Sequence, residues 1–292
     1  MLPKLSFSIQ YANIIILMNI DVKYQNILNE AEPYLLGNPK AFDKYNLSVF
    51  GKEFKEENLK NCLAVKNSNF FSLVHRMDSL TFGHQGMGMD KWVFFDCSAM
   101  PAGIFGFGIP KEKAPEDFLQ MLAVEEDYEG LIPISMYMAI PTSDRGRWFG
   151  HNLSSLNSFL GQKYPGLGLL TKAFACRVFG IHMCYGATQW GSSALEIHTQ
   201  LANMQLRAAH LPAHTHPNSL CYLSDYSEKN ILNALSGKKR SLEDYDLLLN
   251  AEDIERQKKL HQDIERGLKV EIGGRPVHQG KDTLYPINFL EV

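Results

Sequence analysis

Apolar and polar positions divide the chain into regions of different character. Between residues 22 and 63, apolar side chains recur near helical spacing, with a break at Gly37-Asn38-Pro39, and this pattern predicts helices. From Phe70 the character changes, and the apolar residues form short runs typical of strands. The first two runs, residues 92–97 and 103–109, predict strands joined by a hairpin-like connection.

The rest of the central region alternates between strands and helices. Residues 131–140 and 147–156 predict two further strands across a turn. A helix is predicted over residues 167–179. It should end before Gly180, because a residue without a Cβ suits a helix C-terminus. The remaining predicted elements are a strand at 181–189, a helix at 192–201, and strands at 205–213 and 219–224. This order predicts an α/β (α+β) fold with a mixed, mostly antiparallel central sheet flanked by helices.

Segments on both sides extend this core, which we expect at residues 70–225. Residues 18–69 are expected to form an N-terminal helical segment, and residues 226–292 a C-terminal helical and irregular extension with a helix near 251–268. Residues 1–17 are expected to be a non-native or disordered extension, because Met18 begins an amphipathic segment and is the preferred translation start. The apolar run before it is far shorter than the ~20 residues that a membrane helix needs.

The composition argues against several classes of partner. The 292 residues carry a formal net charge of -3, with no basic patch interleaved with aromatic residues, so no long-range field attracts nucleic acid or an anionic membrane. The five cysteines contain no Cys-x-x-Cys pair, which is typical of reduced thiols and argues against a disulfide framework or a cysteine-rich zinc site. We therefore expect a cytoplasmic protein that binds neither nucleic acid nor membrane.

One motif carries most of the chemical information. Gln162-Lys163-Tyr164-Pro165-Gly166-Leu167-Gly168 places a cation and two glycines at the start of the predicted helix 167–179. Amides at the start of a helix have no intrahelical partner, and the helix dipole adds positive potential there. Glycines let this backbone approach an anion closely, so the segment could hold a diphosphate. A turn that caps a core helix is the alternative interpretation.

The motif, placed after antiparallel strands, resembles the acyl-CoA loop of GNAT-type N-acetyltransferases. Their pattern is Gln/Arg-x-x-Gly-x-Gly/Ala followed by an apolar helix, and here Lys163 keeps the cation but loses the planar fork of arginine. The resemblance covers roughly residues 70–225 and implies a GNAT-like fold that uses acetyl-CoA or another acyl-CoA. A rival match at residues 145–150 is less suitable, because Trp148 stands at its first glycine position and would block phosphate oxygens.

The resemblance also implies where the acyl donor binds. The strand before the loop would separate from its neighbour and receive the pantetheine arm, and a backbone N–H near its end would polarise the thioester carbonyl and stabilise the oxyanion. The residues expected to bind the cofactor are Leu153, Ser154, Ser155, Lys163, Tyr164, Gly166, Leu167, Gly168 and Leu169.

Two histidines are candidate catalytic residues, with a structural role open for each. His198, in Ala194-Leu195-Glu196-Ile197-His198, occupies the position where the family often has a tyrosine that reprotonates the leaving thiolate. His151 is the candidate base, because an unperturbed imidazole titrates at about 6.5, near neutral pH.

These residues predict an acyl-CoA-dependent N-acyltransferase that transfers an acyl group, preferably acetyl, directly to the amine of a small molecule or peptide, without a metal. The sequence leaves open whether the protein forms a homodimer. One alternative is a catalytically inactive GNAT-like binding or regulatory module, favoured by the degenerate loop and the missing tyrosine. Another is a metal-dependent enzyme that uses His210, His214 and His216, since the last two would share a face of an extended segment.

Overall fold

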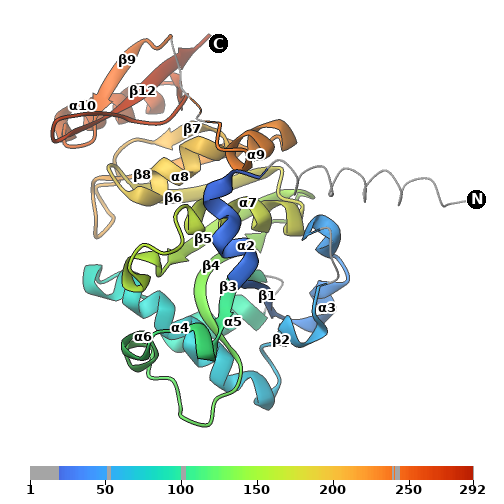
Figure 1. Ribbon diagram of the computed structural model, residues 1–292. Coiled ribbons are helices and arrows are strands. Elements are labelled where there is room, and N and C mark those ends of the chain that lie inside the picture. Colours follow the sequence, from blue (N-terminus) through green and yellow to red (C-terminus); the bar gives the residue numbers. More distant parts are fainter. Residues whose placement is uncertain (1–19, 51–53, 100–102, 239, 241–243, 292) are drawn as a thin grey trace, which may run out of the picture. The chain divides into compact units, whose positions relative to one another are not determined.

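The computed structural model describes residues 20–50, 54–99, 103–238, 240 and 244–291 (Figure 1). The expected extension at residues 1–17 lies outside these residues. The chain divides into two units. Unit 1 comprises the described residues up to Pro141 together with His151–Ile181, and unit 2 comprises Thr142–Gly150 and the described residues from His182 onward.

Unit 1 contains a mixed sheet with the strand order β5-β4-β3-β1-β2. Its strands are β1 (Glu32–Gly37), β2 (Leu59–Asn61), β3 (Gly103–Pro110), β4 (Leu131–Pro141) and the C-terminal part of β5 (Arg147–Ser155). β3 is antiparallel to both β4 and β1, whereas β2 is parallel to β1. β3 and β4 are buried along most of their length, which explains why both appear in the sequence as continuous apolar runs.

The helices of unit 1 pack against this sheet. They are α2 (Gln25–Glu30), α3 (Pro39–Phe42), α4 (Ser68–Phe82), α5 (Lys91–Ala99), α6 (Glu116–Met121) and α7 (Leu167–Phe179). Short 3-10 helices connect them: η1 (Val22–Tyr24), η2 (Leu47–Phe50), η3 (Glu56–Asn58), η4 (Val65–Asn67), η5 (Gly83–Gln85), η6 (Lys111–Lys113) and η7 (Asn157–Leu160). Ring contacts join α4 to β1 (Phe70 and Tyr34, centroids 4.9 Å apart) and α7 to β3 (Phe174 and Phe107, 6.1 Å).

Unit 2 contains a second, mostly antiparallel set of strands in the order β11-β12-β10-β7-β8-β6-β5, with β9 paired to β12. The strands are β6 (Met183–Gln189), β7 (Asn203–Ala208), β8 (Ser219–Asp225), β9 (Leu247–Asn250), β10 (Lys269–Ile272), β11 (Val277–Gln279) and β12 (Asp282–Leu290), and the helices are α8 (Ser193–Leu201), α9 (Glu228–Leu235) and α10 (Ile254–Glu265). Trp190 lies in its apolar core. The indole N–H of Trp190 donates to the Ala209 carbonyl at 2.8 Å.

The structure confirms the predicted class, a mixed and mostly antiparallel α/β fold flanked by helices. The helix predicted over residues 167–179 is α7, with the same bounds, and it ends at Gly180 with φ +66°. The strand predicted at 181–189, the helix predicted at 192–201 and the strand predicted at 219–224 also correspond to observed elements.

The strand predicted at residues 92–97 is wrong, because this segment belongs to helix α5. Its apolar run is too short for the sequence pattern to distinguish the repeat of a helix from the repeat of a strand. In the structure Phe94 and Ser98 are the buried residues of α5, four positions apart, whereas Trp92 is 67% exposed. This spacing is helical. Residues 68–82, where strands were expected to begin, likewise form a helix, α4.

The helical expectation for residues 22–63 is wrong at β1, where buried residues follow one another and the strand pairs with both β2 and β3. The expectation of a helical and irregular extension at residues 226–292 is wrong as well where it omits strands, because β9, β10, β11 and β12 follow β8. Pro286 does not prevent pairing in β12. It lacks an N–H, but its carbonyl accepts a hydrogen bond from the Gly273 N–H at 3.1 Å.

Candidate functional site

The strand β5 pairs with its parallel neighbour over a short stretch. Arg147, Trp148 and Phe149 are in register with Met183, Cys184 and Tyr185 of β6. The ladder therefore uses only the first part of β5, and the remaining residues of the strand continue into unit 1 beside β4.

The end of β5 presents the residues expected to meet the acyl group. Leu153 and Ser155 are half-buried, and Ser154 is fully buried. The Ser154 hydroxyl has no hydrogen-bond partner among the described residues. A buried polar atom without a partner is costly unless a ligand or water satisfies it. This end of the strand therefore offers a polar group as well as backbone to a ligand.

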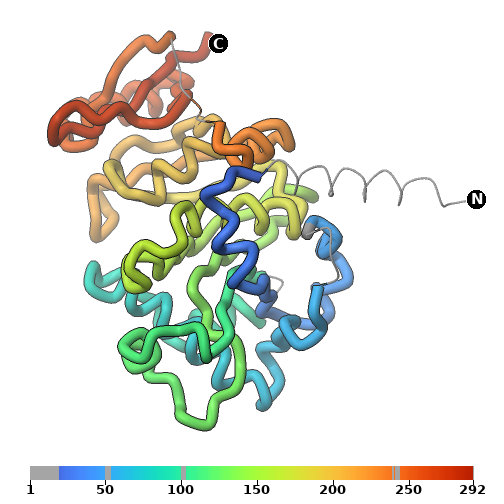
Figure 2. The backbone as a smooth tube through the Cα atoms, viewed as in Figure 1, coloured from blue at the N-terminus to red at the C-terminus, as the bar shows by residue number. Residues whose placement is uncertain are grey.

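A tight loop connects β5 to α7 (Figure 2). Asn157 holds it together, because its Oδ1 accepts the backbone N–H of Tyr164 at 2.7 Å and its Nδ2 donates to Oε1 of Gln162 at 2.8 Å. Gly161 and Gln162 have φ of +61° and +62°, which tightens the turn. The side chain of Asn157 thus fixes the part of the loop from Gln162 to Tyr164, just before α7.

Helix α7 begins with a glycine cap. Gly166 is the N-cap residue with φ +76°, and it provides no side chain to accept the first-turn N–H groups. Gly166 is exposed, whereas Leu167, Gly168 and Leu169 are buried. Such a helix start favours an anion, since the first-turn amides and the helix dipole both act there.

The cation of the loop is paired within the protein. Lys163 Nζ lies 2.5 Å from Oε2 of Glu30 on α2, and the Tyr164 hydroxyl donates to the same oxygen at 3.0 Å. The hydrogen bond from Lys163 lowers the pKa of Glu30, and the same contact raises the pKa of Lys163. Burial is the main reason that the pKa of Tyr164 is raised. An anion that binds the loop must compete with Glu30 for Lys163.

The segment before α2, drawn in blue in Figure 1, also contacts the loop. Tyr24 in η1 is fully buried, and a Cβ added to Gly166 would lie 2.6 Å from its ring carbon Cε1. Gly166 is therefore required by its positive φ and by the approach of Tyr24.

A chain of polar contacts links His151 to helix α4. His151 is exposed on β5, and its Nδ1 lies 2.5 Å from Oδ1 of Asn152. The Asn152 amide nitrogen donates to Oδ1 of Asp78 and contacts the Met89 sulfur at 3.4 Å. Asn152 and Asp78 are both buried.

Asp78 ends this chain on the buried face of α4. Its Oδ2 accepts the backbone N–H of Met89 at 2.9 Å, and Nε2 of His75 lies 2.8 Å from the Met89 carbonyl oxygen. Burial raises the pKa of Asp78, and the hydrogen bonds from Met89 and Asn152 partly oppose this effect. Burial therefore disfavours the charged carboxylate of Asp78, and the two hydrogen bonds stabilise it.

The second predicted catalytic histidine belongs to unit 2. His198 on α8 is 5% exposed, and its ring centroid lies 5.4 Å from that of Tyr222. His151, the end of β5, the loop and the start of α7 all belong to unit 1, whereas His198 does not.

Sequence reasoning missed Asp78, Asn152 and Glu30 as members of this site. The pattern of α4 does contain a signal for Asp78, which follows Phe71 by seven positions and Val74 by four on the buried face. An acid at an apolar position of an amphipathic helix requires a partner. Glu30 offers no such signal, because its contact with Lys163 spans distant parts of the chain.

The three histidines of the metal hypothesis do not form a ligand set. Within the described ranges, no group of three or more histidine, cysteine or acidic side chains could hold a metal ion. His210 is buried, and burial lowers its pKa. Nδ1 of exposed His214 accepts the backbone N–H of His216 at 3.0 Å.

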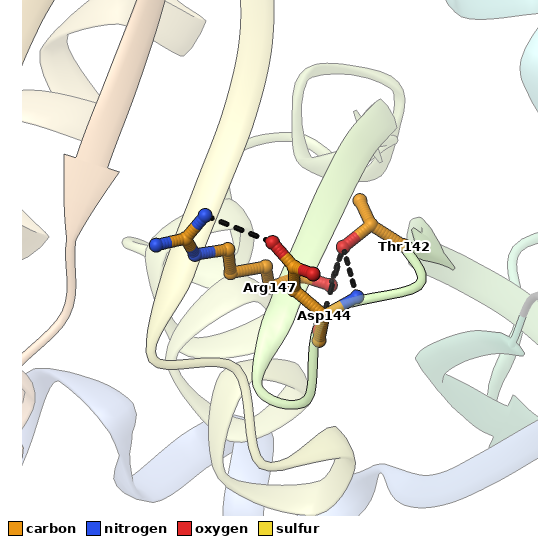
Figure 3. A network of polar contacts seen from close by, with 3 residues as sticks. All are labelled: Thr142, Asp144 and Arg147. Carbon is orange, nitrogen blue, oxygen red and sulfur yellow. Dashed lines mark hydrogen bonds and ion pairs between the residues drawn. The ribbon is translucent and has the colours of Figure 1, made fainter.

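The rival loop at residues 145–150 is a turn and the start of β5 (Figure 3). Arg147 Nη1 binds Oδ2 of Asp144 at 2.9 Å, and the Thr142 hydroxyl donates to the Arg147 carbonyl at 3.0 Å. A Cβ on Gly146 would lie 2.8 Å from the His182 ring. These contacts close a turn between two strands, and no helix begins there.

Among the helices that the structure describes, none has both the length and the apolar character to cross a membrane.

Models of known protein families give no match to the chain, and neither do curated protein sequences. Solved structures do resemble it. The ribosomal-protein alanine N-acetyltransferase of Escherichia coli is 8% identical with a TM-score of 0.37, over 56% of this chain and 91% of that chain. A putative N-acetyltransferase from Lactobacillus plantarum is 9% identical with a TM-score of 0.37, over 68% and 100%. A putative acyl-CoA N-acyltransferase from Klebsiella pneumoniae is 14% identical with a TM-score of 0.34, over 56% and 94%.

These neighbours are described as an N-acetyltransferase, a putative N-acetyltransferase and a putative acyl-CoA N-acyltransferase. At these identities and TM-scores they do not establish an activity. The function is therefore inferred from the residues of unit 1.

Proposed function

We propose that this protein is an acyl-CoA-dependent N-acyltransferase that passes an acyl group, preferably acetyl, directly to the amine of a small molecule or peptide. One observation carries the proposal. In unit 1, the end of β5 leads through a loop held by Asn157 to a helix capped by Gly166, with Lys163 between them.

The loop and helix start would bind the diphosphate of the acyl donor. The glycine-capped start of α7 provides backbone amides, and Lys163 provides a charge once it leaves Glu30. Tyr164 stays beside Lys163 and shares the same acidic partner. Leu167, Gly168 and Leu169 are buried, so they would contribute their backbone and the rigidity of the helix.

The end of β5 would receive the pantetheine arm and the thioester. Backbone N–H groups at Leu153, Ser154 and Ser155 are the proposed donors to the carbonyl oxygen, on which negative charge develops during attack. The unsatisfied Ser154 hydroxyl supports a polar ligand at this place. No metal or covalent enzyme intermediate is needed for this direct transfer.

His151 is the proposed base. Its side chain is exposed on β5, the same strand that carries the proposed oxyanion donors, and it precedes the first of them, Leu153, by two residues. The attacking amine must be neutral, and an imidazole can accept its proton near neutral pH. Reprotonation of the CoA thiolate by His198 rests on the family resemblance alone and stays a prediction.

Calorimetric titration with acetyl-CoA tests the proposal, with Lys163→Ala as the site variant. Lys55→Ala is a matched control, because Lys55 also pairs with a carboxylate at 2.5 Å in unit 1 and is similarly exposed. We expect the wild type and Lys55→Ala to bind, and Lys163→Ala to bind more weakly. No heat of binding with wild-type protein at millimolar acetyl-CoA would contradict the proposal.

The inactive binding module is the second candidate. The buried side chain of His198, which stands where the family often has a tyrosine, favours it. It predicts that CoA binds but that no free thiol is released with any member of a panel of small-molecule and peptide amines. Thiol release with even one amine would exclude it.

A further inference from the structure

Asp78 fixes the direction of the Asn152 amide. Both carboxylate oxygens of Asp78 accept hydrogen bonds, Oδ2 from the Met89 backbone N–H and Oδ1 from Asn152. The amide must therefore present its NH₂ group to Asp78, because a reversed amide would set its oxygen against a carboxylate oxygen. Its own oxygen then faces His151.

This direction fixes the proton on the imidazole. An amide oxygen only accepts hydrogen bonds, so Nδ1 of His151, at 2.5 Å from Oδ1 of Asn152, must be the donor. In the neutral ring Nδ1 then carries the hydrogen and Nε2 carries the lone pair. The contact also sets the orientation of the ring, although His151 itself is exposed.

We propose that Asn152 and Asp78 are positioning residues that hold His151 in the Nδ1–H tautomer, with Nε2 as the atom that accepts the proton of the attacking amine. This inference rests on the proposed N-acyltransferase function. The amine nitrogen forms the N–C bond to the acyl carbon, and the C–S bond breaks to release CoA thiolate. One amine proton passes to Nε2 and is later released to solvent, while the thiolate takes a proton from His198, as the family resemblance predicts, or from solvent.

The burial of the two positioning residues explains why an exposed base could stay oriented. Asp78 is fully buried and Asn152 is 9% exposed, and Asp78 is tied to the backbone of Met89. A hydrogen bond to such a fixed group restrains the orientation of the ring. The opposite nitrogen remains the one that can take a proton.

Nitrogen NMR of the full-length protein tests the tautomer directly. The protein is labelled with ¹⁵N-histidine and measured at a pH where imidazoles are neutral, and the His151 signals are assigned by their loss in His151→Gln. We expect a protonated Nδ1 and an unprotonated Nε2 in the wild type. A protonated Nε2, or shifts that average the two tautomers, would overturn the inference. This result needs no folded variant of the buried residues.

Asn152→Ala provides the second readout. In this variant the His151 signals should move toward an average of the two tautomers, and an unchanged Nδ1–H pattern would remove Asn152 from the role. With an accepted amine, we expect kcat to fall by about 10- to 100-fold while the KM for acetyl-CoA changes less than about twofold. An unchanged kcat would also contradict the inference. If no amine is acetylated but the wild-type tautomer is as expected, the proposed function fails and the positioning of the ring stands.

Discussion

Glu30 and Lys163 form an ion pair with 2.5 Å between Oε2 and Nζ, which ties helix α2 to the loop before α7. The Tyr164 hydroxyl donates to the same carboxylate oxygen. The acid therefore occupies the cation that the loop would offer to a diphosphate, and it competes with the ligand by charge.

Glu30→Gln should strengthen the binding of acetyl-CoA. Removing the carboxylate frees Lys163, and an exposed ion pair contributes up to about 1 kcal/mol, so the Kd should fall by roughly two- to fivefold. Titration calorimetry measures this change. Glu32→Gln is the matched control, because Glu32 pairs with Lys55 at the same 2.5 Å distance in unit 1. Equal effects of the two substitutions would show that competition at the loop is not the cause.

The stability of the protein should depend on Glu30 in acid. The hydrogen bond from Lys163 lowers the pKa of Glu30 below its ordinary value of 4.5. The folded state therefore binds this proton less tightly than the unfolded chain. The stabilising contribution of Glu30 is present above pH 4.5 and is lost as the pH falls through the lowered folded pKa.

Urea unfolding of wild type and Glu30→Gln between pH 7 and pH 3 measures this contribution. The free energy of unfolding should fall more steeply with acid in the wild type, and the two curves should converge at the acidic end. Curves that remain parallel over the whole range would mean that the pair does not contribute to stability.

Gly166→Ala should destabilise the protein more than Gly161→Ala. Both glycines have a positive φ, +76° and +61°, which costs an alanine about 1 kcal/mol. Only the Cβ at position 166 meets a neighbour, since Tyr24 Cε1 would lie 2.6 Å away, whereas nothing lies within 4 Å at position 161. We expect a total loss of about 3 kcal/mol for Gly166→Ala, measured by denaturant unfolding. Equal losses would argue against the contact with Tyr24.

Asn157→Ala should weaken acetyl-CoA binding by loosening the loop. The substitution removes the hydrogen bond to the Tyr164 N–H at 2.7 Å and the bond to Gln162 at 2.8 Å. We expect the Kd to rise by about fivefold, which corresponds to one hydrogen bond of about 1 kcal/mol. Asn38→Ala removes a similar bond, to the Lys40 N–H at 3.1 Å, at the start of α3. An effect on binding from Asn38→Ala of the same size would indicate a general loss of stability.

The sequence predicted those elements whose local pattern agrees with their burial. Helix α7 was predicted with its observed bounds because a mostly apolar segment ends at a glycine that adopts φ +66°. Strands β3 and β4 were predicted because both faces are buried, which produces unbroken apolar runs. In α5 the apolar run contains residues that stay exposed, such as Trp92, so composition indicated a strand where packing selects a helix.

The candidate site was predictable only where its residues are close in sequence. The loop, the cap at Gly166 and His151 were identified from local patterns. The partners Glu30 and Asp78 lie far from Lys163 and Asn152 along the chain, and tertiary packing alone brings these pairs together. Asn152 is adjacent to the predicted residue His151, but its role depends on the carboxylate of Asp78 on α4, which its side chain contacts.

Hydrogen exchange with and without acetyl-CoA tests most directly the claim that β5, the loop and α7 bind the acyl donor. We predict that saturating acetyl-CoA slows exchange of the backbone amides at residues 153–155, 163, 164 and 166–169, with the control peptide of α3 unchanged. Protection that is absent from both segments, or that is confined to other parts of the chain, would contradict the assignment of this site.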